Sequence, residues 1–351
     1  MNSNRHFYVD WLRVIAVFLL ILYHTAIVFQ PWGTMIGFIT NEEKWTGLWL
    51  PMQMLNIWRI PLLFFVSGMG VCFSIQTKNW KEFITERTLR ILLPFLFGYF
   101  VLVPFQSLIW LNIYKIPFVY LPNSGHLWFL GNLFVYVLLF SFPFIYLKNN
   151  FKSKLAITLK KILSNPISIL LVMFCFVIEA LIVKPFPFEM YATTLHGFVL
   201  GMLAFLFGFC FAYTGDNFFL MIRKWKWLTL FLAFGLYTSR ILQNLNSAPN
   251  YLLAIESAFW IITILAFTNQ YLNRSSNFLN YMNKAVYPIY MIHIIVLFAI
   301  SKILLPLQMN VQLKFILLLL FTGFGSWLLY EFIIKRIKLI RPLFGLKQSS
   351  I

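Results

Sequence analysis

The chain has 351 residues, of which 61% are hydrophobic and only 11% are charged, and its formal net charge is +18. A soluble domain normally carries about 25% charged residues, so this chain has too little polar surface to cover a water-facing body. The basic residues lie in short loops between apolar segments. That placement indicates orientation in a membrane, and we expect no nucleic-acid partner.

Apolar segments close to twenty residues long recur along the whole chain, and a helix needs about that length to cross roughly 30 Å of hydrocarbon. No small-x-small cleavage site follows the first of them, so we expect a retained helix and not a signal peptide. The pattern predicts an all-α, polytopic membrane protein with about ten spans. These spans are 11–29, 50–75, 90–112, 127–147, 166–183, 195–214, 226–243, 252–272, 285–304 and 314–334.

Basic residues gather in alternate loops. The chain's start, the loops after the second, fourth, sixth and eighth spans, and the chain's end hold 21 of the 28 lysines and arginines. Positively charged loops stay cytoplasmic, so we expect both termini in the cytoplasm and an even number of spans. No loop is long enough to fold alone, and residues 1–351 are interpreted as a single transmembrane domain without an appended soluble domain. The basic stretch 148–161 is interpreted as a solvated loop, in preference to an amphipathic helix on the inner leaflet.

Several well-known catalytic signatures are missing from the sequence. The three cysteines, Cys72, Cys175 and Cys210, fall in separate apolar runs, which does not suit a zinc site or a disulfide framework. There is no glycine-rich phosphate loop, CxxC, HExxH or GxSxG motif. We therefore expect neither a metal cofactor nor ATP hydrolysis.

The first span carries Asp10, Arg13 and His24, and a charge inside a bilayer costs several kcal/mol or more. Arg13 and His24 are eleven residues apart, so they share nearly one face and are separated by about 16 Å along the axis. Arg13 is expected at the cytoplasmic rim, where snorkelling beside Asp10 is the plainer explanation. His24 is expected in the outer half, where a buried imidazole needs partners for both nitrogens.

Two further arginines, Arg87 and Arg90, open the third span at the same cytoplasmic rim as Arg13. Their spacing of three places them on one helix face. Guanidinium groups gathered there suit a phosphorylated cytosolic ligand, because the planar fork matches phosphate oxygens. A purely orienting role for these charges is the alternative.

Other polar residues are placed on the outer side or within later spans. His126 precedes the fourth span at its outer end, and His196 begins the sixth at the same side. Tyr287, Tyr290 and His293 form an i, i+3, i+6 stripe in the ninth span, which is interpreted as a packed polar seam and not as a catalytic row. Near the inner end of the last span, Glu331 is expected to balance one of the cytoplasmic arginines.

Six segments, spread from residue 7 to residue 347, share one resemblance. They are FYVDWLRVIAVFLLILYHTAIVF (7–29), IPLLFFVSGMG (60–70), ERTLRILLPFLFG (86–98), GHLWFLGNLFVYVL (125–138), YPIYMIHIIVL (287–297) and YEFIIKRIKLIRPLFGLK (330–347). Together they resemble the acyltransferase family 3 membrane proteins. The closing segment is similar to the glucan-modifying, succinyl-transferring branch. The specific elements are an arginine and a histidine separated by ten residues, here Arg13 and His24, and the paired arginines, here Arg87 and Arg90.

The resemblance implies an O-acyltransferase of the cell inner (plasma) membrane, with many spans. Such an enzyme moves an acetyl or succinyl group from cytoplasmic acyl-CoA to a hydroxyl of an extracytoplasmic carbohydrate or glycolipid. Arg13, Arg87 and Arg90 are then expected to hold the acyl-CoA phosphates. His24 is expected to act as the general base or as a transient acyl carrier, and both roles stay open. His126 is assigned an outer-side acceptor or relay role.

Two further features of the sequence concern the expected function. Some family members carry a fused esterase-like periplasmic domain, and nothing in this chain supplies one, so we expect that a second transfer step is absent or is performed by a partner. A transporter or flippase without chemistry fits the composition equally well, although such proteins more often show halves related by an internal repeat. The sequence shows no such repeat. The acceptor and the acyl group are not identified by any motif in the outer loops.

Overall fold

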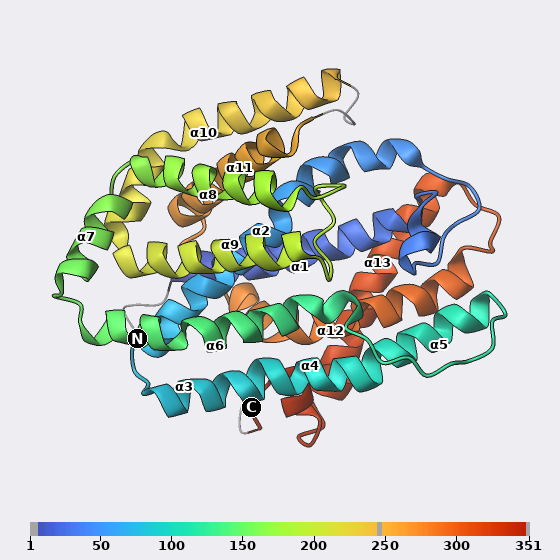
Figure 1. The fold of residues 1–351 in the computed structure, drawn as a ribbon. Helices are drawn as coiled ribbons and strands as arrows, with labels where there is room; N and C mark the ends of the chain where they lie inside the picture. The colour runs from blue at the N-terminus through green and yellow to red at the C-terminus, as the bar shows by residue number, and fades with distance from the viewer. Residues whose placement is uncertain (1–5, 244–247, 349–351) are drawn as a thin grey trace. The chain divides into compact units, whose positions relative to one another are not determined.

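Every regular element in residues 6–243 and 248–348, the ranges that this computed structural model describes, is a helix (Figure 1). Eight of these helices are long and apolar enough to cross a membrane. They are Phe7–Ile27, Thr46–Ile75, Trp80–Ile113, Gly125–Asn149, Leu195–Thr214, Asn250–Tyr271, Asn277–Leu304 and Val311–Ile334. The prediction of an all-helical, multi-pass membrane protein is therefore confirmed for the described residues.

Two of the ten predicted spans differ from the other eight. The segment 166–183 lies in α8 (Ile167–Val183), which meets the span criteria only together with α7 (Lys154–Leu163), across a bend of 92°. The segment 226–243 lies in α10 (Asp216–Leu242), a long helix with several charged residues that is not among the candidates. The described residues thus contain eight candidate spans, or nine if the bent pair counts as one.

The interpretation of 148–161 as a solvated loop is wrong for most of its length, because Lys154–Leu163 forms helix α7. Ser153 begins this helix, since its hydroxyl accepts a hydrogen bond from the backbone N of Ala156 at 3.2 Å. Ala156 and Leu163 are buried, whereas Lys154 and Lys161 are exposed. A one-sided apolar pattern of this kind stabilises a surface helix in spite of its lysines.

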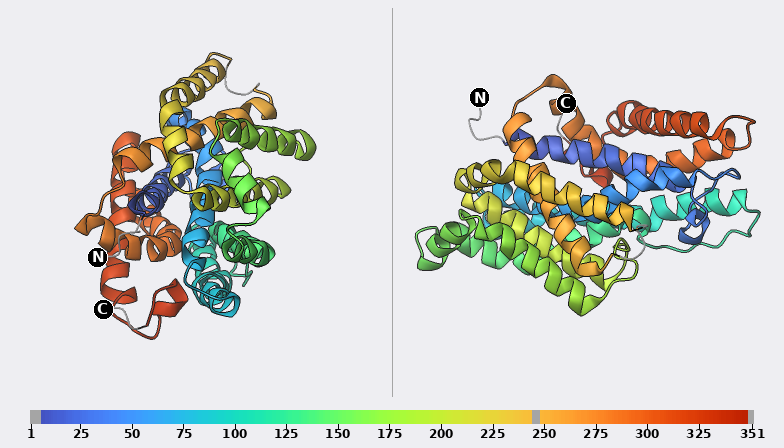
Figure 2. Two further views of the ribbon diagram at one scale, coloured as in Figure 1. Left: turned by 90° about the vertical axis from the view of Figure 1, so that its left-hand side faces the viewer. Right: turned by 90° about the horizontal axis from the view of Figure 1, so that it is seen from above.

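The chain divides into two compact units that interleave along the sequence. Unit 1 comprises Met1–Arg13, Met54–Glu86 and Asn132–Ser276. In this unit α10 lies beside α11 (Asn250–Tyr271), α11 lies beside α8, and α8 lies beside α9 (Leu195–Thr214), as Figure 2 shows. The unit also contains α6 (Trp128–Asn149) and most of α2 (Trp49–Ile75).

Glycine allows α2 and α9 to approach at backbone contact in unit 1. A Cβ atom on Gly68 would lie 2.0 Å from the carbonyl oxygen of Phe205, and one on Gly208 would lie 2.0 Å from that of Phe65. No larger residue fits at either position without moving a backbone. Small residues at such crossings are typical of helix packing in membranes, where close van der Waals contact drives association.

Unit 2 comprises Val14–Gln53, Arg87–Gly131 and Asn277–Ile351. Its central helix is α12 (Asn277–Leu304), which packs against α13 (Val311–Leu329) and α5 (Val103–Ile113). Most of α1 (Phe7–Ile27) belongs to this unit, whereas its first residues up to Arg13 belong to unit 1. Short 3-10 helices complete the connections: η1 (Gly33–Ile36), η2 (Thr46–Leu48), η5 (Gly125–Leu127) and η7 (Arg341–Phe344).

The helical run Trp80–Ile113 is not a uniform α-helix. It passes through α3, η3, α4 and η4 before α5, and η3 and η4 are π-helical. Another π-helical segment, η6 (Tyr330–Ile334), follows α13. Such π segments occur frequently at functional sites, and η3 is the segment that contains Arg90. The bounds within the run are α3 (Trp80–Arg87), η3 (Thr88–Leu92), α4 (Leu93–Phe97) and η4 (Gly98–Leu102).

Candidate active site

Two histidines from distant parts of the chain meet in unit 2. Nδ1 of His24, on α1, lies 2.8 Å from Nε2 of His293, on α12, and the two rings are parallel. His293 is fully buried, and its Nδ1 lies 2.6 Å from the backbone carbonyl oxygen of Tyr290. The three groups form a continuous chain of hydrogen bonds from a helix backbone to His24.

These hydrogen bonds determine the tautomers of His24 and His293. A carbonyl oxygen only accepts, so Nδ1 of His293 must carry a proton and donate it to Tyr290. In a neutral His293 the Nε2 atom is then the acceptor, and Nδ1 of His24 donates to it. His24 therefore holds its lone pair on Nε2. That is the arrangement of a general base or nucleophile oriented by a third group.

His126 belongs to the same cluster. Its ring lies 5.2 Å from the His293 ring, and its Nε2 lies 3.2 Å from the carbonyl oxygen of Met291. The carbonyl again requires the proton on Nε2, which leaves Nδ1 as the acceptor atom. That Nδ1 is buried and has no hydrogen-bond partner in the part of the chain that the structure describes. In addition, the hydroxyl of Tyr290 donates to the backbone carbonyl of His126 at 2.8 Å.

The segment after α1 closes over His24. The ring of Phe38 lies 5.4 Å from the His24 ring, and the backbone N of Asn41 donates to the carbonyl of Val28 at 2.9 Å. The indole of Trp110, on α5, donates to the carbonyl of Phe38 at 3.3 Å. These contacts hold an aromatic surface against His24, which is half-buried.

Three imidazoles this close together raise the question of a metal site. The facing nitrogens of His24 and His293 are at hydrogen-bond distance, 2.8 Å, and point at each other. Within residues 6–243 and 248–348, no three histidine, cysteine or acidic side chains are placed to hold one metal ion. The geometry fits proton transfer between the two rings.

Arg13 lies in unit 1, and its guanidinium rests against helix α2. Nη1 donates to Oδ1 of Asp10 at 3.3 Å, and the side chain is 38% exposed. A Cβ atom on Gly70 would lie 2.3 Å from Nη2 of Arg13. The second glycine of the "SGMG" segment thus provides the space that the guanidinium occupies.

Arg87 ends α3 and Arg90 lies in η3, both half-buried in unit 2. The chain's C-terminal segment packs here: Phe344 stacks edge-on against Phe97 at 5.4 Å. A Cβ atom on Gly345 would lie 3.2 Å from the carbonyl oxygen of Arg90. The backbone that carries Arg90 is therefore supported by a segment far from it in sequence.

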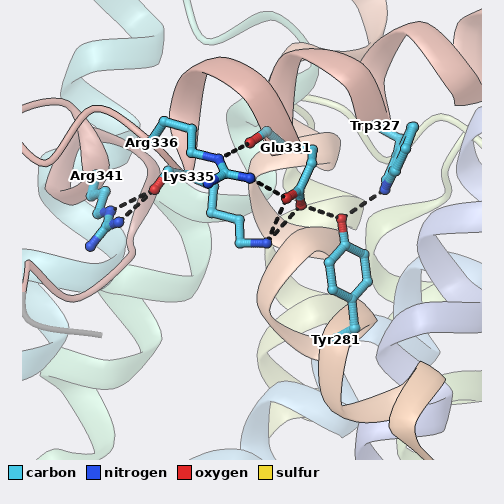
Figure 3. A network of polar contacts seen from close by, with 6 residues as sticks. All are labelled: Tyr281, Trp327, Glu331, Lys335, Arg336 and Arg341. Carbon is cyan, nitrogen blue, oxygen red and sulfur yellow. Dashed lines mark hydrogen bonds and ion pairs between the residues drawn. The ribbon is translucent and has the colours of Figure 1, made fainter. Parts of the chain in front are cut away.

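A polar network anchors that C-terminal segment (Figure 3). Glu331 accepts hydrogen bonds from Lys335 at 2.7 Å and from the hydroxyl of Tyr281 at 2.7 Å, and it pairs with Arg336 at 3.4 Å. Glu331 thus pairs with an arginine, Arg336, as expected, although Lys335 lies closer; the cytoplasmic side of this pair stays a prediction. Nε and Nη2 of the buried Arg341 both donate to the carbonyl of Lys335, at 3.0 and 2.6 Å.

The structure thus joins His24 and His126, which sequence reasoning proposed, through His293, which it interpreted as part of a packed seam. The sequence did single out His293 as part of the i, i+3, i+6 stripe. Spacing within one helix, however, cannot show that its partner lies on another helix. His196 has a separate partner: its Nδ1 lies 2.8 Å from Oε1 of Glu179, and both side chains are buried in unit 1. The expected convergence of Arg13 with Arg87 and Arg90 stays a prediction.

His24 is half-buried, and His293 orients its imidazole. A membrane protein with such a residue fits the class of group-transfer enzymes. The family model described as "Acyltransferase domain" matches residues 6–331. The chain belongs to this acyltransferase family, and it is an acyltransferase enzyme of the membrane. No curated protein and no solved structure matches the chain.

Proposed function

We propose that the protein transfers an acyl group, acetyl or succinyl, from cytoplasmic acyl-CoA to a hydroxyl of an extracytoplasmic carbohydrate or glycolipid. One observation carries this proposal: the hydrogen bonds from Tyr290 through His293 to His24 leave the lone pair of His24 on Nε2. Family membership supplies the reaction class, and the oriented imidazole supplies the group that can perform it.

In the general-base form of the reaction, Nε2 of His24 takes the proton of the acceptor hydroxyl. The alkoxide oxygen attacks the thioester carbonyl, and the tetrahedral intermediate collapses with loss of the CoA thiolate. The thiolate then takes the proton from His24, which returns the imidazole to its starting form. His293 keeps accepting from Nδ1 of His24 throughout, so the positively charged ring stays oriented.

In the acyl-carrier form, Nε2 of His24 attacks the thioester itself and the CoA thiolate leaves. The resulting acyl-imidazolium is then attacked by the acceptor hydroxyl, which receives the acyl group; its proton goes to the CoA thiolate, and His24 returns to the neutral imidazole. Both forms need the same tautomer. They differ in that only the second gives a covalent enzyme intermediate before the acceptor reacts.

On the donor side, we propose that Arg13, Arg87 and Arg90 bind the phosphates of acyl-CoA. Guanidinium groups are suited to this because they present several donors in a planar fork. Arg13 and His24 share helix α1 and lie about 16 Å apart along its axis, a distance that the thioester arm of CoA can bridge. The same helix would then connect the phosphate end of the donor with the reacting end.

We further propose that α8 and α10 also cross the bilayer, which gives ten spans and places both termini in the cytoplasm. The membrane is then the inner (plasma) membrane of the cell. The bias of basic residues toward alternate loops supports this arrangement. His126 would then lie on the outer side, where its Nδ1 can accept a hydrogen bond from the acceptor hydroxyl. The succinyl-transferring, glucan-modifying branch is one specific form of this proposal.

The test uses purified protein in lipid nanodiscs with acetyl-CoA or succinyl-CoA and measures release of free thiol. Exchange of labelled CoA into the acyl-CoA without acceptor separates the two mechanisms, because only the acyl carrier supports it. The variant His24→Ala should lose about 10²- to 10⁴-fold in rate. If His24→Ala reacts at the wild-type rate, the proposed role of His24 is wrong.

The transporter or flippase that the composition also allowed is set aside, because the chain belongs to an acyltransferase family. Mass spectrometry of envelope glycans and lipids, with and without the gene, identifies the acceptor by the loss of an acyl mass.

A further inference from the structure

A stripe of three polar rings runs along one side of α12. Tyr287 stacks on Tyr290 at a centroid distance of 6.4 Å, and Tyr290 stacks on His293 at 6.2 Å. The stripe ends at His24, which is hydrogen-bonded to His293. It therefore extends the His24 cluster by two rings along α12.

Tyr287, at the other end of the stripe, lies close to the backbone of Arg90. A Cβ atom on Gly345 would lie 2.4 Å from Cε1 of Tyr287 and 3.2 Å from the carbonyl oxygen of Arg90, so Gly345 lies close to both. Its positive φ of 69° is a conformation that glycine adopts readily, which allows the C-terminal segment to turn closely at this point. Tyr287 thus sits near the backbone of Arg90, and His293 sits beside His24.

The polar atoms of the stripe differ in how they are satisfied. The hydroxyl of Tyr290 donates to the carbonyl of His126, and both nitrogens of His293 are hydrogen-bonded. The hydroxyl of Tyr287 is buried and has no partner in the described ranges of the chain. Leaving a buried hydroxyl unsatisfied is costly, and such a group in a functional region calls for an explanation.

We propose that the hydroxyl of Tyr287 donates a hydrogen bond to a carbonyl oxygen of the pantetheine arm of acyl-CoA. This inference rests on the proposed function, in which the donor extends from the arginines to His24. An arm that follows this course passes Tyr287 and carries two amide carbonyls, each an acceptor that suits an orphaned phenol O–H.

The geometry assigns Tyr287 to the arm and not to the reacting carbon. Tyr287 precedes His293 by six residues, or about 9 Å along the helix axis, and the ring of Tyr290 lies between them in the stack. A hydroxyl hydrogen bond spans less than about 3 Å. Tyr287 is therefore a donor-binding residue, and its loss should affect binding of acyl-CoA without affecting the acceptor.

The variant Tyr287→Phe removes only the hydroxyl. We expect the KM for acetyl-CoA or succinyl-CoA, measured by thiol release, to rise about tenfold, because a hydrogen bond to the donor is lost. Without ligand, the Tm of this variant should stay equal to that of the wild type or rise, because the hydroxyl is unsatisfied in the protein alone.

The matched control is Tyr290→Phe, on the same helix, which loses a hydrogen bond that is formed in the structure. Its Tm without ligand should fall. A Tm that falls in Tyr290→Phe but not in Tyr287→Phe distinguishes a hydroxyl that stabilises the fold from one that is available to a ligand. A lowered Tm for Tyr287→Phe together with an unchanged KM for acyl-CoA would overturn the proposal.

A second donor separates this inference from the proposed function. Acyl-pantetheine keeps both amides but lacks the nucleotide, so Tyr287→Phe should still lose about tenfold in kcat/KM with it, whereas Arg90→Ala should lose activity only with acyl-CoA. If the wild-type protein reacts with neither donor, the proposed function fails. If the wild type is active and Arg90→Ala is impaired while Tyr287→Phe matches the wild type on both donors, only the inference about Tyr287 fails.

Discussion

Nε2 of His293 lies 2.8 Å from Nδ1 of His24, and the other nitrogen of His293 is held by the carbonyl of Tyr290 at 2.6 Å. His293 thus occupies the place that a carboxylate takes beside the histidine of a catalytic triad. A neutral imidazole orients His24 and selects its tautomer but contributes no full negative charge. A buried carboxylate at this depth would cost more, since charge is expensive within a bilayer.

The orienting role of His293 predicts different outcomes for two substitutions. His293→Leu removes the acceptor and should lower kcat by at least about tenfold, though by less than the roughly 10⁴-fold found when a charged orienting partner is lost. His293→Gln offers an amide oxygen to Nδ1 of His24 and should retain more activity than Leu. Thiol release by the purified variants measures both, and equal activity of Leu and Gln would argue against a tautomer role.

A second prediction concerns the space beside Arg13. In Gly70→Ala the new Cβ would lie 2.3 Å from Nη2 of Arg13, so the guanidinium must move. If Arg13 binds the donor phosphates, the KM for acyl-CoA should rise several-fold, because charge-assisted hydrogen bonds depend on geometry. With acyl-pantetheine, which lacks the nucleotide, the variant should match the wild type.

Gly235→Ala is the control for this substitution. Gly235 lies in α10, in the same unit, and nothing lies within 4 Å of the position of its Cβ. Alanine there should leave the KM unchanged and stabilise the helix by up to about 1 kcal/mol. A rise in KM in both variants would indicate a general effect of added methyl groups and not a displaced Arg13.

The sequence contains enough information for the helical class and for part of the site. Length and hydropathy identify α1 as a span, and the intramembrane cost of polar groups singles out His24 on it. The partner of His24 was not predictable in the same way. His293 lies 269 residues away, and only the packing of α12 brings it to α1. Spacing within one helix shows which residues share a face, but not which other helix meets that face.

Contacts with another helix also matter for α10, which was predicted as a span over 226–243 but is not among the candidate spans. Its charged residues lower its hydropathy, yet several of them are satisfied by the neighbouring helix α11. Arg223 donates to Oδ1 of Asn269 at 2.9 Å, and Nε of Arg240 lies 3.1 Å from Oε2 of Glu256. Composition counts these groups as polar, whereas in the folded unit they are paired. A hydropathy criterion applied to one helix therefore cannot account for polar groups that a second helix neutralises.

The pair of Arg240 and Glu256 gives a third prediction. Both side chains are buried, and Trp260 also donates to Glu256 at 3.3 Å. Glu256→Ala leaves the guanidinium without this carboxylate and should lower stability by about 3–5 kcal/mol. Replacing both residues, as Arg240→Met with Glu256→Leu, should cost much less. Thermal unfolding in detergent measures the difference, and a double variant as unstable as Glu256→Ala would contradict this account.

A last prediction tests the contact between the C-terminal segment and the donor region. In Gly345→Ala the residue must keep a φ of 69° that alanine adopts at a cost of about 1–2 kcal/mol, and its Cβ would press on Tyr287 and on the carbonyl of Arg90. We expect a lower Tm and a KM for acyl-CoA that rises more than that of Tyr287→Phe alone, because both the ring and the Arg90 backbone shift. Gly323→Ala, on α13, is the matched control, since nothing lies within 4 Å of its Cβ. If Gly345→Ala lowers the Tm but leaves the KM for acyl-CoA at the wild-type value, the C-terminal segment stabilises the fold without shaping the donor site.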